Sequence, residues 1–145
     1  MSDYQQNRSR KFRRFQIVSC LVITVLGISV VAFNLAAQPR DSDGTRMQAQ
    51  KVALGTTHKD TLAPPADSSD WRYVQIEKAT RFTISVSSEP ADKNVTVALT
   101  TATGNELAQS SSSNGRVEIT RQLDPGIYYI NIQSGSPVSY RMSIQ

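Results

Sequence analysis

The chain has 145 residues and a formal net charge of +4, a length that allows one compact domain and excludes more. The positive charge is concentrated in residues 1–15, where five basic residues accompany one acidic residue, whereas residues 38–70 carry −1 and residues 71–145 carry +1. The C-terminal part is therefore almost neutral, so the high pI does not indicate a basic face for nucleic acid, and we expect no nucleic-acid partner.

Residues 1–15 predict a short basic tail, and residues 16–37 predict a transmembrane helix. From Ile17 to Ala37 there are 21 residues without a charge, and about 20 apolar residues suffice to cross a bilayer. The basic residues precede this run, so the positive-inside rule places the N-terminus in the cytoplasm and the C-terminal part on the other side. We expect a single-pass protein of the bacterial inner membrane, with its folded part in the periplasm or outside.

Three interpretations of this apolar segment compete. A cleaved signal peptide would have a shorter apolar core, although the sequence Leu35-Ala36-Ala37 offers a cleavage site. A lipoprotein signal would place the apolar run before Cys20, whereas here the run continues after it. A retained signal-anchor helix is the interpretation that we prefer. Cys20 is the only cysteine of the sequence, so an intrachain disulfide and a cysteine-based metal site are excluded.

One face of this predicted helix collects small and weakly polar residues at alternating spacings of four and three. Such a stripe lets another helix approach closely and offers hydrogen bonds between helices. An apolar helix of this length also contains a few such residues by chance, so both interpretations stay open. The candidate helix-packing residues are Cys20, Thr24, Gly27, Val31 and Asn34.

Residues 38–70 are rich in Asp, Ser, Thr and Pro and predict a flexible extracytoplasmic linker. Within it, the stretch TRMQAQKVAL is compatible with a short helix ending before Gly55. The only histidine of the sequence, His58, lies in this segment, which argues against a fixed Ser-His-acid arrangement.

Residues 71–145 predict an all-β domain, because apolar residues alternate with polar ones between regularly spaced turns. Breaks are expected at Glu89-Pro90, Thr103-Gly104, Asn114-Gly115, Pro125-Gly126 and Ser136-Pro137. We expect a small antiparallel β-sandwich of seven or eight strands. The candidate strands lie in WRYVQIE, RFTISVS, NVTVALT, a short run around Leu107, GRVEITRQL, GIYYINI and SYRMSI, and QSSSSNG (109–115) is expected to be a hairpin loop.

Several blocks of this region also follow a known order: Asp70-Trp71, RFTISV, TGNELAQS, LDPGIYYINI and SYRMSI. In this order the region resembles the bacterial pre-peptidase C-terminal domain, a small jelly-roll-like sandwich often appended to secreted peptidases. The chain departs from that pattern because the turn Lys78-Ala79-Thr80 lacks a glycine and because no peptidase precedes the domain. The resemblance implies the fold and an adhesive or accessory role, not an enzymatic one.

Candidate chemistry in the sequence is sparse. The predicted domain contains neither Cys nor His, so we expect no zinc site and no cofactor. Calcium could use the carboxylates of Asp67, Asp70, Asp92 or Asp124, but the sequence has no dense acidic loop motif, and each is more simply a turn or capping residue. Some relatives in the resembling family bind calcium or fibrous proteins, but no residue of this chain matches those sites.

Alternation places one group of large side chains on the outside of the predicted sandwich: Trp71, Tyr73, Ile127 and Tyr129. Exposed aromatic side chains can stack on sugars or anchor a protein interface, although Trp71 could also cover the end of the core. We therefore expect a non-enzymatic accessory or scaffolding subunit of a larger membrane complex, which contacts an integral membrane partner through its helix and sandwich. The alternative is a membrane-tethered module that binds cell-wall glycan.

Overall fold

The structure is a computed structural model that describes residues 42–112 and 114–145. The chain separates into two compact units, Met1–Arg40 and Asp41–Gln145, and the description below concerns the second. The predicted basic tail, the transmembrane helix and its packing stripe (Cys20, Thr24, Gly27, Val31 and Asn34) lie outside the described residues. Within the described residues, no helix is both long enough and apolar enough to span a membrane.

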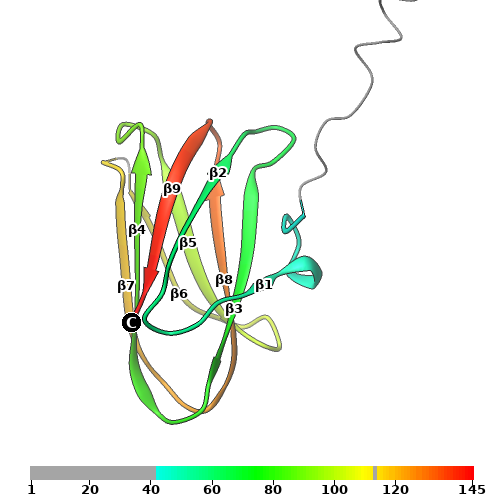
Figure 1. Cartoon of the computed structure of the whole chain (residues 1–145), viewed down its shortest axis with the longest axis vertical. Coiled ribbons are helices and arrows are strands. Elements are labelled where there is room, and N and C mark those ends of the chain that lie inside the picture. Colours follow the sequence, from blue (N-terminus) through cyan, green and yellow to red (C-terminus); the bar gives the residue numbers. More distant parts are fainter. Residues whose placement is uncertain (1–41, 113) are drawn as a thin grey trace, which may run out of the picture. The chain divides into compact units, whose positions relative to one another are not determined.

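In the described part of the chain, nine strands form two facing sheets (Figure 1). One sheet has five strands in the order β1-β3-β8-β5-β6, and the other has four in the order β2-β9-β4-β7. All neighbours are antiparallel except β1 and β3. The elements are the 3-10 helix η1 (Arg46–Gln48) and strands β1 (Gln50–Lys51), β2 (Thr57–Leu62), β3 (Ser69–Ile76), β4 (Thr80–Glu89), β5 (Val95–Thr101), β6 (Glu106–Ser112), β7 (Arg116–Leu123), β8 (Gly126–Ser134) and β9 (Val138–Ile144).

The apolar residues of alternate strand positions fill the space between the sheets. Phe82, Ile84 and Val86 of β4 are buried, as are Ile130 and Ile132 of β8. Each of these residues has an outward-facing polar or half-exposed neighbour, which is the pattern of two sheets packed over one apolar layer. The predicted all-β sandwich is thus confirmed, although the described residues form nine strands where seven or eight were expected.

The strand boundaries differ from the prediction at one hairpin. The segment 109–115 was expected to be a loop, but β6 continues to Ser112 and pairs with β5 from Val95 to Thr100. Its serines are extended because the β5 backbone supplies a hydrogen-bonding partner, which polar composition alone does not reveal. Between β6 and β7, Gly115 has a φ of +75°.

The main correction concerns the segment 38–70, which the composition predicted to be a flexible linker. Its described part contains η1, β1, β2 and the start of β3, so the sandwich begins near residue 42 rather than at residue 71. The helix expected in TRMQAQKVAL is limited to η1, after which Val52 is buried in the core. Strand β2 pairs with β9 along its whole length, as Figure 1 shows.

Strand β2 lacks the apolar alternation of the others for a physical reason. Of its six residues, Leu62 alone is buried, because the strand lies at the edge of the four-stranded sheet. Its inward-facing position 60 is an aspartate that pairs with Arg72, so a charge contact replaces an apolar one. Because backbone pairing and an ion pair hold this strand, its sequence has no apolar alternation and cannot be distinguished from that of a polar loop.

Candidate functional site

A group of charged side chains lies inside the sandwich, around Arg72 of β3. Because Val74 and Ile76 face inward, the period of two also directs Asp70 and Arg72 inward, and both are buried. The Arg72 guanidinium forms ion pairs with Asp43 and, at 2.6 Å, with Asp60 of β2. It lies 3.7 Å from the carboxylate of Asp70. This single cation thereby joins the residues before η1 to β2 and β3.

Tyr140 of β9 completes the same cluster. Its hydroxyl donates a hydrogen bond to the Asp70 carboxylate and lies 3.4 Å from an Arg72 nitrogen. Burial, assisted by the hydrogen bond to Asp70, raises the pKa of the Tyr140 phenol far above its ordinary value, while the charge of Arg72 acts in the opposite direction. The phenol therefore stays protonated and serves as a structural donor.

Asp43, Asp60 and Asp70 each place a carboxylate oxygen within 4.8 Å of the others, a spacing that a metal cation could also bridge. Calcium requires six to eight oxygen ligands, and a neighbouring guanidinium would repel it. Here Arg72 contacts all three carboxylates and supplies the positive charge itself. The cluster fits a structural ion-pair network and not a calcium site. Of the other candidate calcium ligands, Asp92 pairs with Lys93.

The predicted interaction surface lies on the outer face of the five-stranded sheet. Tyr73 and Tyr129 are directly opposite in the β3–β8 pair, with ring centroids 6.0 Å apart. Trp71 is half-buried, and Ile127 is 44% exposed. The structure thus brings the four residues onto one face.

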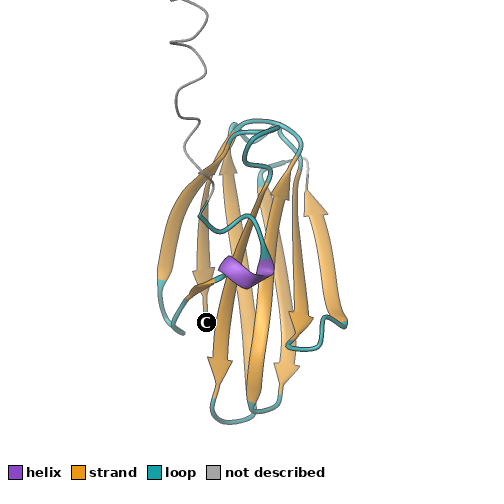
Figure 2. Ribbon diagram, turned by 90° about the vertical axis from the view of Figure 1, so that its right-hand side faces the viewer, coloured by secondary structure: helices purple, strands orange, loops and turns teal. Residues whose placement is uncertain are grey.

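The chain itself covers part of this aromatic surface. Figure 2 shows η1 crossing the outside of the sheet, and β3 is in contact with it. The Arg46 guanidinium lies 4.4 Å from the centroid of the Tyr129 ring and donates hydrogen bonds to the carbonyls of Thr101 and Ala102. The Trp71 backbone N–H also donates to the Asp43 carbonyl. One face of Tyr129 is thus occupied, so a sugar could not stack there while η1 keeps this position.

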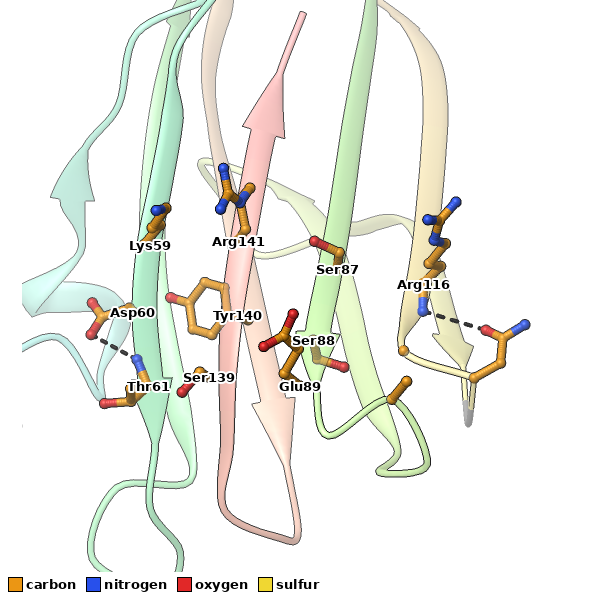
Figure 3. Close-up of a pocket in the computed structure, with 13 residues that line it drawn as sticks. Lys59, Asp60, Thr61, Ser87, Ser88, Glu89, Arg116, Ser139, Tyr140 and Arg141 are labelled. Atoms are coloured by element: carbon orange, nitrogen blue, oxygen red, sulfur yellow. Dashed lines mark hydrogen bonds between the residues drawn. The ribbon is translucent and has the colours of Figure 1, made fainter.

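The outer face of the four-stranded sheet is different, because a shallow groove of about 790 Å³ opens on it (Figure 3). The hydroxyl groups of Thr61, Ser87 and Ser139 line the groove from three adjacent strands. All three residues are exposed, and each belongs to the outward-facing set of its strand. No pattern in the sequence predicted this groove.

The strand register brings three cations into one row across this groove. Lys59 of β2 is opposite Arg141 of β9, Arg141 is opposite Ser87 of β4, and Ser87 is opposite Arg116 of β7. Figure 3 shows these side chains on four successive strands. Like charges in directly opposite positions typically cost roughly 0.2–1 kcal/mol of stability. In the part of the chain that the structure describes, none of the three cations forms an ion pair within 4.0 Å.

His58 does not contribute a catalytic arrangement. It lies in β2 rather than in a linker, and a ring nitrogen is 2.8 Å from the Thr56 hydroxyl. Within the described residues, its side chain contacts no carboxylate at ion-pair distance.

No protein-family model matches the chain, and a search of curated proteins also finds no match. Solved structures do match. The pre-peptidase C-terminal domain of collagenase from Bacillus anthracis is 22% identical, with a TM-score of 0.61, over 75% of this chain and 99% of that domain. The surface-associated copper-binding protein CorA of Methylomicrobium album BG8 is 8% identical, with a TM-score of 0.55, over 67% of this chain and 98% of that protein.

These matches establish the fold: the described domain is a pre-peptidase C-terminal-like β-sandwich. The first match covers three quarters of the chain, whereas residues 71–145 are about half of it, which agrees with a domain that begins near residue 42. Carbohydrate-binding modules are also among the β-sandwiches found, such as that of the Cellvibrio mixtus lichenase 5A (13% identity, 61% of this chain and 86% of the module). Its TM-score of 0.36 is too low to inform function.

Proposed function

We propose that this protein is a non-enzymatic binding module, that residues 16–37 tether it to a bacterial inner membrane, and that its periplasmic or outer sandwich binds cell-envelope polysaccharide. The observation that supports glycan binding is the open groove on the four-stranded sheet, with hydroxyl groups on adjacent strands. Hydroxyl groups donate and accept hydrogen bonds, as sugar hydroxyls do. A shallow, polar, extended surface suits a chain of sugars better than a compact apolar ligand.

The same groove gives little support for catalysis. Glycoside hydrolysis generally needs two available carboxyl groups on either side of the scissile bond. Two acidic residues line the groove. Glu89 faces outward, whereas Asp60 faces inward and already accepts hydrogen bonds from Arg72 and from the Thr61 N–H. Binding without turnover is the simpler function for this arrangement.

The proposal is tested by cosedimentation of the full chain, in mild detergent, with insoluble bacterial cell-wall polysaccharide. Ser87→Trp fills the groove, and Gln109→Trp places the same side chain at an exposed position on the outside of the five-stranded sheet. We expect wild type and Gln109→Trp to sediment with the polysaccharide and Ser87→Trp to remain in solution. Equal sedimentation of all three would exclude the groove, and sedimentation of none would exclude glycan binding.

The aromatic surface can be tested in the same assay. Because Arg46 covers Tyr129, we expect the double variant Trp71→Ala, Tyr129→Ala to keep most of its binding. Loss of binding in that variant, together with retention in Ser87→Trp, would move the site to the five-stranded sheet.

A role as accessory subunit of a membrane complex is the second candidate. Two large apolar side chains on or beside the outer face of the five-stranded sheet favour it, since Met47 is 99% and Ile127 is 44% exposed. Exposed apolar groups of this kind can form the centre of a protein interface. A pull-down from detergent-solubilised membranes should then recover a stoichiometric membrane partner. The variant Met47→Ser, Ile127→Ser should lose that partner, and Leu54→Ser should retain it.

A further inference from the structure

The row Lys59–Arg141–Arg116 is the strongest unexplained feature of the described surface. The row runs across the strands from β2 to β7, and neighbouring strands lie about 4.8 Å apart, so its ends are about 14 Å apart. All three side chains are exposed and come from three different strands. The inward-facing residues fix the register of these strands, and that register places the cations in one line.

The rows on either side of these cations are different. One contains Thr61, Ser139 and Glu89, and the other contains Thr57, Ser143, Ser85 and Glu118. Each therefore holds hydroxyl groups and one carboxylate. The hydroxyl groups of Thr57 and Ser143 are 3.0 Å apart, so this polar face is continuous across β2 and β9. A single line of positive charge is thus bordered by hydroxyls and by negative charge.

We propose that this row recognises the carboxylate groups of an acidic polysaccharide whose chain lies across the four strands. Arginine and lysine donate charge-assisted hydrogen bonds to carboxylates, and the neighbouring hydroxyls can hydrogen-bond to the sugar rings between them. Glu89 and Glu118 would repel a broad anionic surface, such as a membrane or a nucleic-acid duplex, because such a surface would also contact the two rows that contain these carboxylates. A single chain with separated charges avoids both carboxylates.

This inference rests on the proposed glycan binding and adds the charge of the ligand. It does not involve Arg72, whose guanidinium is buried and fully engaged with three aspartates. The chain also provides a matched control on the same face. Arg81 of β4 is exposed and faces outward six residues from Ser87, about 20 Å along the strand, and is outside the row.

The test is a calorimetric titration of the full chain, in mild detergent, with polygalacturonate and with its methyl ester, which has the same backbone without the charges. We expect binding to polygalacturonate that weakens as salt is raised, and at least about tenfold weaker binding to the ester. Arg141→Gln and Arg116→Gln should each weaken binding about threefold to tenfold, and Arg81→Gln by less than about twofold. Circular dichroism of each variant checks that the fold is retained.

The alternative outcomes are distinguishable. Equal affinity for polygalacturonate and its ester, with unchanged affinity in Arg141→Gln, would refute charge recognition and leave the glycan proposal intact. Binding to neither polymer, together with no cosedimentation with cell-wall polysaccharide, would refute both proposals. Binding to vesicles of anionic lipid that is lost in Arg141→Gln, without binding to polygalacturonate, would overturn the glycan assignment in favour of a membrane surface.

Discussion

Replacing Arg72 by methionine should destabilise the whole sandwich, because this residue neutralises charge in its interior. Methionine keeps an unbranched side chain of similar length. It removes the guanidinium that Arg72 places beside the buried carboxylates of Asp43 and Asp70. Removing one partner of a buried ion pair typically costs about 3–5 kcal/mol. Asp60 adds little to this cost, because its side chain is 43% exposed and surface pairs contribute about 0–1 kcal/mol.

A loss of this size is a large part of the about 5–15 kcal/mol by which domains are usually stable. For a domain of this length, it should lower the melting temperature by about 10 °C or more. Chemical denaturation of wild type and Arg72→Met, followed by circular dichroism, measures the free energy of unfolding. The matched control is Arg81→Met, at an exposed position, which should change stability by less than about 0.5 kcal/mol. A cost below about 1 kcal/mol for Arg72→Met would refute the role assigned to this cluster.

Three other local contacts should also contribute measurably to stability. Arg46→Ala removes the contact with Tyr129 and the hydrogen bonds to Thr101 and Ala102. We expect the free energy of unfolding to fall by about 1–2 kcal/mol and proteolysis within residues 42–56 to become faster. Lys51→Ala is the near-neutral control. Unchanged proteolysis would show that Arg46 does not hold this segment. Gly115→Ala should cost about 1–3 kcal/mol, since φ is +75° and the added Cβ would lie 2.8 Å from the Cα of Ala91, whereas Gly135→Ala meets nothing within 4 Å and should be neutral. Similar unfolding free energies for the two variants would contradict this account. Folding raises the pKa of Tyr140, so the contribution of this phenol to stability is complete below the unfolded value near 10 and declines at higher pH, by about 1.4 kcal/mol per pH unit. Tyr140→Phe should therefore flatten the dependence of unfolding free energy on pH above about 10. Equal slopes in wild type and Tyr140→Phe would be inconsistent with a protonated, buried phenol.

Strands β4, β5, β7, β8 and β9 could be predicted from the sequence because their inward positions are mostly apolar. Alternation of Phe82, Ile84 and Val86, for example, requires one buried face and leaves no competing helical pattern. Strand β2 could not be predicted in this way, because its inward position 60 is an aspartate. Its place in the sheet comes from backbone pairing with β9 and from an ion pair with Arg72, a partner twelve residues away.

The interior cluster was nevertheless accessible to sequence reasoning. If Val74 and Ile76 face inward, then Arg72 and Asp70 do so as well, and Tyr140 follows from Met142 and Ile144. A charged residue at an inward position requires a partner of opposite charge, and the preceding polar segment is rich in aspartate. That requirement argues against a free linker before β3.

The cation row could not be read from the sequence. Lys59, Arg116 and Arg141 are far apart along the chain, and each occupies an ordinary solvent-facing position. Their alignment depends on the registers of three strand pairs, which the buried residues determine. The outward aromatic residues, by contrast, lie on the single strand pair β3–β8, and alternation predicts that they face outward. That η1 covers Tyr129 through the cation–π contact of Arg46 could not be predicted in the same way.

The most direct test of glycan binding at the groove is to map the bound surface by nuclear magnetic resonance. The isotopically labelled full chain, in detergent, would be titrated with soluble cell-wall oligosaccharides, and amide shifts would be followed on both sheets. We expect shifts at outward positions of the four-stranded sheet, such as Lys59, Ser87 and Arg141, with Gln109 unaffected. Shifts confined to Trp71 and Tyr73, with the groove unchanged, would contradict it.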